Sequence, residues 1–317
     1  MTLLAVILLL ALAAAWWGAH RIASPDDYFA AGRRAGAWLV GVAGTAAAVS
    51  AFTFVGGPGL FAVAGVGSLW IILSAPLTGA LQCWAVGEPV VELARRNGVL
   101  TPQELLGARF GRGARGAAAL VIALGVVASL AVQAKAAAVL AQAFLNVPPL
   151  AGALVVMAAT TAYTALGGMR AGLLADAVQG AVMACLGVGL AGAALIAAGG
   201  PLAAIDALQT SRPALLGSFG ATPPAAAFAW FLLFALGTCA QPHYLQKFLF
   251  LRSPSQLRAL PAVLTGALTA TLAIWVGIGL AGTAMQASGV VSPTRPDGLM
   301  PAVMAHLGPA AVVMAAA

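Results

Sequence analysis

The polar groups that could bind an ion or a solute in this chain lie inside long apolar runs. Residues 38–67 are apolar enough to form a membrane-spanning helix, yet they contain Thr45, Ser50 and Thr53, followed by Gly56-Gly57-Pro58-Gly59. Pro58 lacks an amide proton and its glycine neighbours hold a helix weakly, so we predict a break at residues 56–59. A break at this depth leaves carbonyl groups without helical partners, and with the nearby hydroxyls they suit a small cation and a small solute. The alternative is an ordinary kinked helix with packing glycines.

Two ionisable side chains also fall within apolar runs. Asp176 lies about one turn into a span, where a charged side chain costs on the order of 2–3 kcal/mol and by default marks a functional site. The alternative is an interfacial aspartate stabilised by the amino end of its helix and by Arg170. Lys135 lies beyond mid-depth of another span, where its ammonium could pair with a carboxylate of the solute. Its alternatives are a lysine that reaches outward to the interface, or one neutralised by burial.

No group of residues has the spacing of an enzyme site. Glu88 and Glu92 are one helical turn apart, but Arg95 and Arg96 follow directly, which predicts ion pairs and not catalysis. The sequence contains no nucleophile elbow, phosphate loop or zinc-ligand spacing. The three cysteines are widely spaced in apolar runs and are predicted to be core residues. We therefore do not predict an enzyme.

The elements that position these residues belong to a polytopic helical membrane protein. Of the 317 residues, 62% are hydrophobic and only 7% are charged, and the mean hydropathy is +1.00. A soluble domain has about a quarter of its residues charged. The net charge of +7 lies mainly in short loops between apolar runs, so it predicts orientation in a lipid bilayer and not binding of nucleic acid.

Apolar runs and turn residues divide the chain into eight spans and the start of a ninth. Besides a leading helix at 2–17 and the broken helix, we predict spans at 68–92, 114–145, 150–166, 172–198, 225–250 and 261–284. Residues 167–170 are predicted to form a tight turn, and Thr101 to cap a short surface helix. Gln241-Pro242-His243 interrupts the 225–250 span, and the region from 284 to 309 is predicted to be a loop.

The basic residues give the orientation of the spans. Twelve of the 15 Lys and Arg residues, Lys247 among them, are predicted to lie on one side of the membrane, two on the other, and Lys135 within a span. This imbalance places the first side in the cytoplasm and the amino terminus outside, in a bacterial inner membrane. The two interrupted spans are five spans apart and run in opposite directions, a pattern that indicates an inverted repeat with a binding site between its halves.

Four stretches resemble the sodium:solute symporter family, which includes sodium/proline, sodium/pantothenate and sodium/glucose carriers. The stretches are DYFAAGRRAGAW, VSAFTFVGGPGL, YTALGGMRAGLLADAVQG and CAQPHYLQKFL, and the resemblance covers essentially the whole chain. The third is the most specific, because the family reads Tyr-Thr-x-x-Gly-Gly and then Thr-Asp-x-x-Gln. Asp176 and Gln179 are in place here, while Ala175 replaces the usual threonine. The Gln-Pro-His motif is most similar to the proline and pantothenate branch.

The resemblance implies an all-α polytopic membrane fold in a single transporter domain. A leading helix in residues 1–20 would be followed by two inverted repeats of five helices. Residues 37–198 would form the first repeat, and residues 223–317 the start of a second repeat that is incomplete in this sequence.

The resemblance also implies a sodium site. The carbonyls of Ala46 and Val49, with Ser50 beside them, match the family's sodium ligands, and Asp176 matches an aspartate that assists sodium release to the cytoplasm. Carbonyl oxygens suit such a cation because they replace its hydration shell. The family's later helix adds a hydroxyl pair, so we expect this sequence to contain half of the site.

Thr53, Phe234 and Thr238 match positions that line the solute pocket in relatives, and Gln241 flanks the break beside them. A threonine in a spanning helix can instead bond its own backbone. With Lys135, these residues predict a small polar solute, either an amino acid or a carboxylic acid.

These features predict sodium-coupled symport of a small organic solute by alternating access, with Na⁺ as the coupling ion. The partners would be the solute, sodium and the lipid bilayer. The alternative is a transporter-like membrane sensor domain that precedes a signalling kinase, and the region after residue 317 would distinguish the two.

Overall fold

The computed structural model describes residues 22–48 and 52–316, together with residues 13, 16, 17 and 20. Within these residues the chain is helical apart from turns and one isolated bridge, in which Ala35 pairs with Leu251. The all-α prediction is confirmed. The leading helix predicted at 2–17 falls almost wholly outside the described residues.

The helices of the described part follow one another along the chain. The α-helices are α2 (Pro25–Ala30), α3 (Ala37–Ala48), α4 (Gly57–Ala64), α5 (Trp70–Leu73), α6 (Ala75–Ala80), α7 (Glu88–Asn97), α8 (Pro102–Phe110), α9 (Arg112–Leu145), α10 (Pro149–Ala197), α11 (Pro201–Ser211), α12 (Pro224–Gly237), α13 (Pro242–Phe248), α14 (Leu260–Ala287), α15 (Leu299–Leu307) and α16 (Pro309–Ala316). The π-helical segments are η2 (Phe52–Gly56) and η4 (Leu81–Gly87). The 3-10 segments are η1 (Ala31–Arg33), η3 (Gly65–Leu69), η5 (Pro213–Leu216), η6 (Pro254–Arg258) and η7 (Pro296–Gly298).

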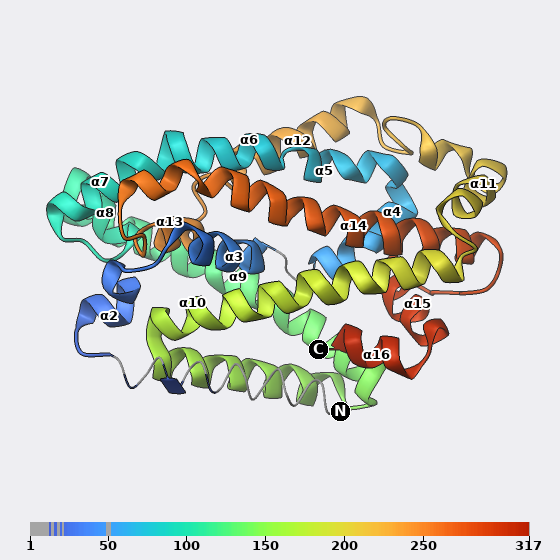
Figure 1. Ribbon diagram of the computed structural model, residues 1–317, viewed down its shortest axis with the longest axis horizontal. Coiled ribbons are helices and arrows are strands. Elements are labelled where there is room, and N and C mark those ends of the chain that lie inside the picture. The colour runs from blue at the N-terminus through green and yellow to red at the C-terminus, as the bar shows by residue number, and fades with distance from the viewer. Residues whose placement is uncertain (1–12, 14–15, 18–19, 21, 49–51, 317) are drawn as a thin grey trace.

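Most predicted spans occur as helices with small shifts at their ends. α9 covers the span predicted at 114–145, and α14 covers the one predicted at 261–284. The fifth and sixth spans are the two halves of α10, which meet at Gly168 (φ +57°), where the chain reverses (Figure 1). Among the described residues, four helical stretches are long and apolar enough to cross a membrane: Thr53–Asn97, Arg112–Gln142, Thr164–Ala197 and Pro224–Phe248.

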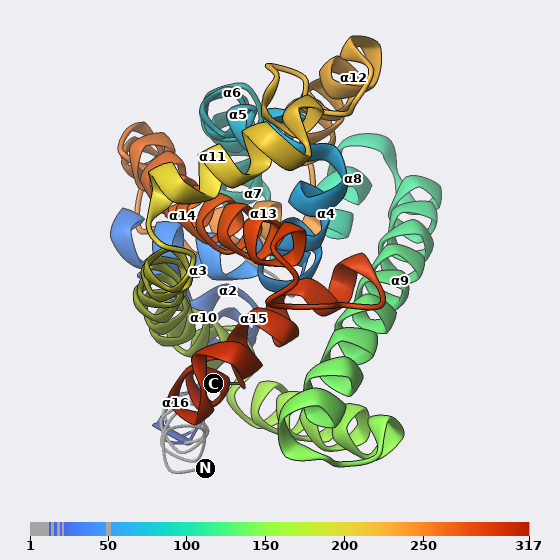
Figure 2. The ribbon, with the colours of Figure 1, turned by 90° about the vertical axis from the view of Figure 1, so that its right-hand side faces the viewer.

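The long helices α9, α10 and α14 run along the long axis of the molecule, with α2, α7, α8 and α13 at one end and α11 and α15 at the other (Figure 1). The first end carries basic residues predicted for the cytoplasmic side, such as Arg95 of α7 and Arg109 of α8. Figure 2 shows α9 at the rim, where it packs against α8 and α10 and none of its most apolar stretch is buried.

The first break differs from its prediction. Gly56 has helical dihedral angles (φ −70°, ψ −39°), and Pro58 falls in the first turn of α4, so the chain does not break at residues 56–59. Proline is tolerated there because the first helical turn leaves its amide protons unpaired in any case. The irregularity begins upstream, where residues 52–56 widen into the π-helical η2, a geometry frequent at functional sites.

The interruption of the seventh span is confirmed, since α12 ends at Gly237 and α13 begins at Pro242. The loop predicted from 284 to 309 is wrong in part, because it contains η7 and α15. Cys185 is exposed, contrary to the prediction that all three cysteines are core residues.

Two apolar clusters fix the helices that carry the polar groups. Leu173 of α10, Phe248 of α13 and Leu260 of α14 are buried in the first cluster. Leu190 of α10 and Ile274 of α14 are buried in the second. Because α3, α10 and α14 also pack against one another, close van der Waals contacts hold these three helices as one unit, with Asp176 on α10.

Candidate functional site

Asp176, Lys247 and the main-chain carbonyl of Ala43 form a charged cluster where three helices meet. Lys247 Nζ of α13 lies 2.7 Å from Asp176 Oδ2 of α10, and it also donates a hydrogen bond to the Ala43 carbonyl oxygen of α3. The Lys247 side chain is 10% exposed and the Asp176 side chain 33% exposed. The ammonium is therefore almost withdrawn from solvent and depends on these oxygens for compensation.

Lys247 belongs to α13, inside the span predicted at 225–250, and its side chain is buried, which its inclusion among the basic residues of the cytoplasmic side does not predict. Asp176 and the Ala43 carbonyl replace the water that a loop lysine would contact, which is why burial is tolerated. The sequence does carry a partial signal, since Lys247 comes only five residues after Pro242, a residue suited to the start of a helix. It does not identify the partner, which lies 71 residues away in the chain.

The expected sodium ligand Ala46 faces the helix that carries Asp176. A Cβ atom at Gly180 would lie 2.8 Å from Ala46 Cβ and 3.2 Å from the Val42 carbonyl oxygen, so α3 and α10 approach closely because position 180 has no side chain. Asp176 and Gly180 are four residues apart, which places them on one face of α10 about one turn apart. Ala43 and Ala46 share a face of α3 for the same reason. The other two expected sodium groups, Val49 and Ser50, lie outside the described residues.

Metal binding by a cluster of side chains is not supported in the part of the chain that the structure describes. No group of three or more His, Cys, Asp or Glu residues there could hold a metal ion. An ion beside Ala46 would rest chiefly on carbonyl and hydroxyl oxygens, with Asp176 as the nearby carboxylate.

The interruption between α12 and α13 receives a hydrogen bond from a side chain of η4, the segment that precedes α7. Pro242 has no amide proton, so the carbonyl of Thr238 loses the helical partner that residue 242 would supply. Gln82 of η4, which is 2% exposed, donates from Nε2 to that oxygen over 2.7 Å, and Gln241 N donates to it over 3.3 Å. Thr78 Oγ1 of α6 lies 3.4 Å from the Phe234 carbonyl oxygen, but its shorter hydrogen bond, 3.0 Å, goes to the Ser74 carbonyl at the N-cap of its own helix. Gln82 is not among the residues predicted from the sequence, although a glutamine inside an apolar run is a usable signal.

Replacing Gln82 with leucine is expected to lower the free energy of unfolding by about 1–3 kcal/mol, because the half-buried Thr238 carbonyl loses its side-chain donor. The measurement is the thermal unfolding midpoint of the purified protein in detergent. Gln133→Leu on α9 is the matched control, since the Gln133 side chain makes no hydrogen bond to any described residue. Equal midpoints for the two variants would show that the Gln82 hydrogen bond does not stabilise the interruption.

The structure brings together two of the residues predicted to contact a solute. Phe234 and Thr238 lie one turn apart at the end of α12, where the Thr238 hydroxyl donates to the Phe234 carbonyl of its own helix. Gln241 is the N-cap residue of α13. Thr53 is buried in η2, which packs against α4, α14 and α15, and Lys135 is exposed on α9. Their roles in solute binding stay predictions.

The segment before α3 is joined to the segment after α13 by main-chain hydrogen bonds. Ala35 N donates to the Phe250 carbonyl over 3.0 Å, and Arg252 N donates to the Ala35 carbonyl over 2.9 Å. Arg95 of α7 adds a bond of 2.8 Å to the Leu251 carbonyl. The charged end of the molecule thus ties α3 and α13 together although 193 residues or more separate them in the chain.

α2 is anchored at the same end. Its N-cap residue Ser24 donates from its hydroxyl to Asp27 Oδ2 over 2.9 Å, and this hydrogen bond holds the pKa of Asp27 below its ordinary value. Burial opposes that shift, and the Arg170 and Arg34 guanidinium groups support it. The Tyr28 hydroxyl donates to the Ala165 carbonyl over 3.1 Å and so connects α2 to the first half of α10.

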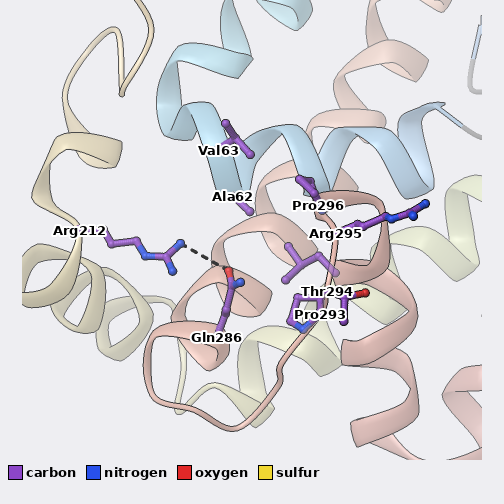
Figure 3. Close-up of a pocket in the computed structure, with 9 residues that line it drawn as sticks. Ala62, Val63, Arg212, Gln286, Pro293, Thr294, Arg295 and Pro296 are labelled. Carbon is purple, nitrogen blue, oxygen red and sulfur yellow. Dashed lines mark hydrogen bonds between the residues drawn. The ribbon is translucent and has the colours of Figure 1, made fainter.

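A surface pocket lies at the opposite end, where α4, α14 and α15 meet the end of α11 (Figure 3). Its volume is about 190 Å³, and Arg212 Nη1 donates to Gln286 Oε1 across it over 3.4 Å. Figure 3 shows the Arg295 side chain pointing away from this pair. None of the residues predicted for the ion or the solute lines this pocket.

An interrupted spanning helix, together with a half-buried carboxylate on a neighbouring helix, is typical of secondary transporters. The profile of the sodium:solute symporter family matches residues 28–315 of the chain. The chain belongs to this family, whose members are transporters.

Two known proteins show the extent of the similarity. The sodium/pantothenate symporter of Escherichia coli (strain K12) is 32% identical over 224 residues, which are 69% of this chain and 46% of that protein. The chain thus spans about half the length of the curated relative it matches. A solved structure of a Na⁺-coupled sialic acid symporter, in a substrate-bound outward-open state, superposes with a TM-score of 0.83 at 19% identity. The match covers 99% of this chain and 68% of that one, and it shows the shared fold.

Proposed function

We propose that the protein couples the inward movement of Na⁺ to the uptake of a small organic solute by alternating access. The bilayer would be the bacterial inner membrane, with the amino terminus outside. The observation that carries the proposal is the close contact of Ala46 with Gly180, with Asp176 one turn further toward the charged end of the molecule. Family membership supports sodium as the coupling ion.

The geometry supports a path for sodium along the interface between α3 and α10. An ion held by the carbonyl of Ala46 that moves toward the α13 end meets Asp176 within about one helical turn. A carboxylate at this depth attracts a cation leaving its carbonyl ligands, because Coulomb attraction is stronger where water is scarce. Asp176 would thereby assist release to the cytoplasm.

The solute is proposed to be an amino acid or a carboxylic acid, bound near the interruption between α12 and α13. The similarity to a sodium/pantothenate symporter supports a carboxylic acid. Phe234, Thr238 and Gln241 supply an apolar ring and polar groups at that interruption, and Thr53 and Lys135 are further candidates on η2 and α9. We propose transport without a catalytic step, in one domain built from two inverted repeats.

The test is uptake into membrane vesicles from cells that express the intact gene product. Radiolabelled pantothenate, proline and a panel of other amino and carboxylic acids are offered with and without an inward sodium gradient, and with a proton gradient alone. Uptake of one acid that requires sodium supports the proposal. Uptake driven equally by protons overturns the coupling ion, and no uptake of any solute favours the sensor alternative.

Asp176→Asn is expected to lower sodium-driven uptake about tenfold or more, because a charge-assisted contact is worth about 1.5–3 kcal/mol. The initial rate at a fixed sodium gradient is the measurement. Asp206→Asn is the matched control, since Asp206 is exposed on α11 at the opposite end and its carboxylate makes no ion pair with a described residue. Equal rates for Asp176→Asn and the control would remove Asp176 from the sodium path.

A further inference from the structure

The ammonium group of Lys247 donates hydrogen bonds to two oxygen atoms that lie on the proposed path of sodium. Its ammonium, which has three donors and no acceptor, contacts Asp176 Oδ2 and the Ala43 carbonyl. The first acceptor is the carboxylate proposed to attract sodium, and the second belongs to the helical face of Ala46. An ammonium is a compact point charge on a flexible stem. The Lys247 ammonium can therefore occupy the position beside Asp176 that would otherwise attract a monovalent cation.

We propose that Lys247 is a positioning residue that acts as a tethered cation, occupying Asp176 in the conformation described here. Sodium engages this carboxylate only when the ammonium withdraws. The inference deepens the proposed function and rests on it. Lys247 would thus set the sodium concentration at which the site fills, in addition to stabilising the fold.

The arrangement of α13 fits such a device. α13 is a short helix set off from α12 by the interruption at residues 238–241, and it packs against α3, α7 and α8. Among the described residues, the pair between Lys247 and Asp176 is the hydrogen-bonded link from α13 to α10. Opening this pair removes the polar link between α13 and α10, while the main-chain bonds that join Ala35 to Phe250 and Arg252 stay intact.

If Lys247 competes with sodium for Asp176, the sodium affinity should differ among the Lys247 variants in a definite order. An ion pair that only stabilises the fold predicts no such order. Lys247→Gln removes the competing charge, so sodium should bind at lower concentration. Lys247→Arg keeps the charge and can hold the carboxylate through two parallel hydrogen bonds, so sodium should need a higher concentration. A structural pair predicts a loss of stability in the first variant and no change in sodium affinity in either.

The experiment measures thermal unfolding of the purified intact gene product against sodium chloride, with choline chloride holding the ionic strength constant. For Lys247→Gln, the sodium concentration that gives half of the maximal stabilisation should fall about tenfold, the equivalent of one charge-assisted hydrogen bond. For Lys247→Arg it should rise severalfold. In the double variant Asp176→Asn with Lys247→Gln, the gain of the single Gln variant should disappear, because the carboxylate is gone.

Arg96→Gln is the matched control, since it removes an equal charge from an exposed ion pair with Glu92 at the same end of the molecule. If Lys247→Gln does not fold, the proposal is tested by the higher half-saturating sodium concentration expected for Lys247→Arg. Unchanged half-saturation in the Lys247 variants, with sodium still stabilising all of them, overturns this inference alone. No sodium effect on the unsubstituted protein, in stability or in uptake, overturns the proposed function and this inference together.

Discussion

Replacing Gly180 with leucine is expected to abolish sodium-driven uptake while the protein still reaches the membrane. A Cβ atom at this position alone would come within 2.8 Å of Ala46 Cβ and 3.2 Å of the Val42 carbonyl, so the longer side chain must push α3 away from α10. Overpacking of this kind costs about 1–3 kcal/mol. The greater effect is on the site, because Ala46 and its carbonyl would move away from Asp176.

The measurement is the initial rate of sodium-driven uptake, normalised to the amount of protein in the membrane. Gly189→Leu is the matched control on the same helix, because nothing lies within 4 Å of a Cβ atom at that position. It should transport like the unsubstituted protein. Gly180→Ala should fall between the two, since it introduces the clash without the longer chain. Normal uptake by Gly180→Leu would show that sodium binding does not require the close approach of α3 to α10.

Much of this fold follows from local sequence. The runs at 114–145 and 261–284 predict α9 and α14 because their apolar length and flanking turn residues leave little alternative in a bilayer. Pro242 locates the interruption of the seventh span, because a proline withholds the amide proton on which the preceding turn depends. Pro58 gives the opposite result, since this proline lies in the first turn of α4 and the chain does not break there.

The partners of the polar groups could not be predicted in the same way. Lys247 and Asp176 are 71 residues apart, and Gln82 and Thr238 are 156 apart, so their pairing depends on how distant helices pack. Counting basic residues by side of the membrane also gives no information on burial, so it does not reveal the buried ammonium of Lys247. The prediction that Lys135 contacts the solute rests on its depth and on the resemblance of its region to one that flanks the solute pocket in relatives. Neither tells which side of α9 faces the rest of the protein, and Lys135 is exposed.

Gly168 is the position where the chain reverses between the two halves of α10. Its backbone has φ +57° and ψ −162°, a conformation that is essentially restricted to glycine. A Cβ atom there would lie 2.8 Å from Tyr28 Cδ2 and 2.9 Å from the Tyr28 carbonyl oxygen. The same tyrosine donates its hydroxyl to the Ala165 carbonyl. Gly168 thus allows the chain to reverse and leaves the space in which Tyr28 of α2 packs against α10.

Gly168→Val is therefore expected to prevent correct folding, and little protein should be recovered from the membrane. Backbone strain costs about 1–3 kcal/mol, and the overlap with Tyr28 adds about 1–3 kcal/mol, together a large fraction of the stability of a typical domain. Gly172→Val, one turn further along α10, is the matched control, because a Cβ atom there meets nothing within 4 Å. The amount of monodisperse protein extracted in mild detergent is the measurement. Equal recovery of both variants would mean that the two halves of α10 can reverse direction without the glycine conformation, and that Asp176 does not depend on this turn for its position opposite α3.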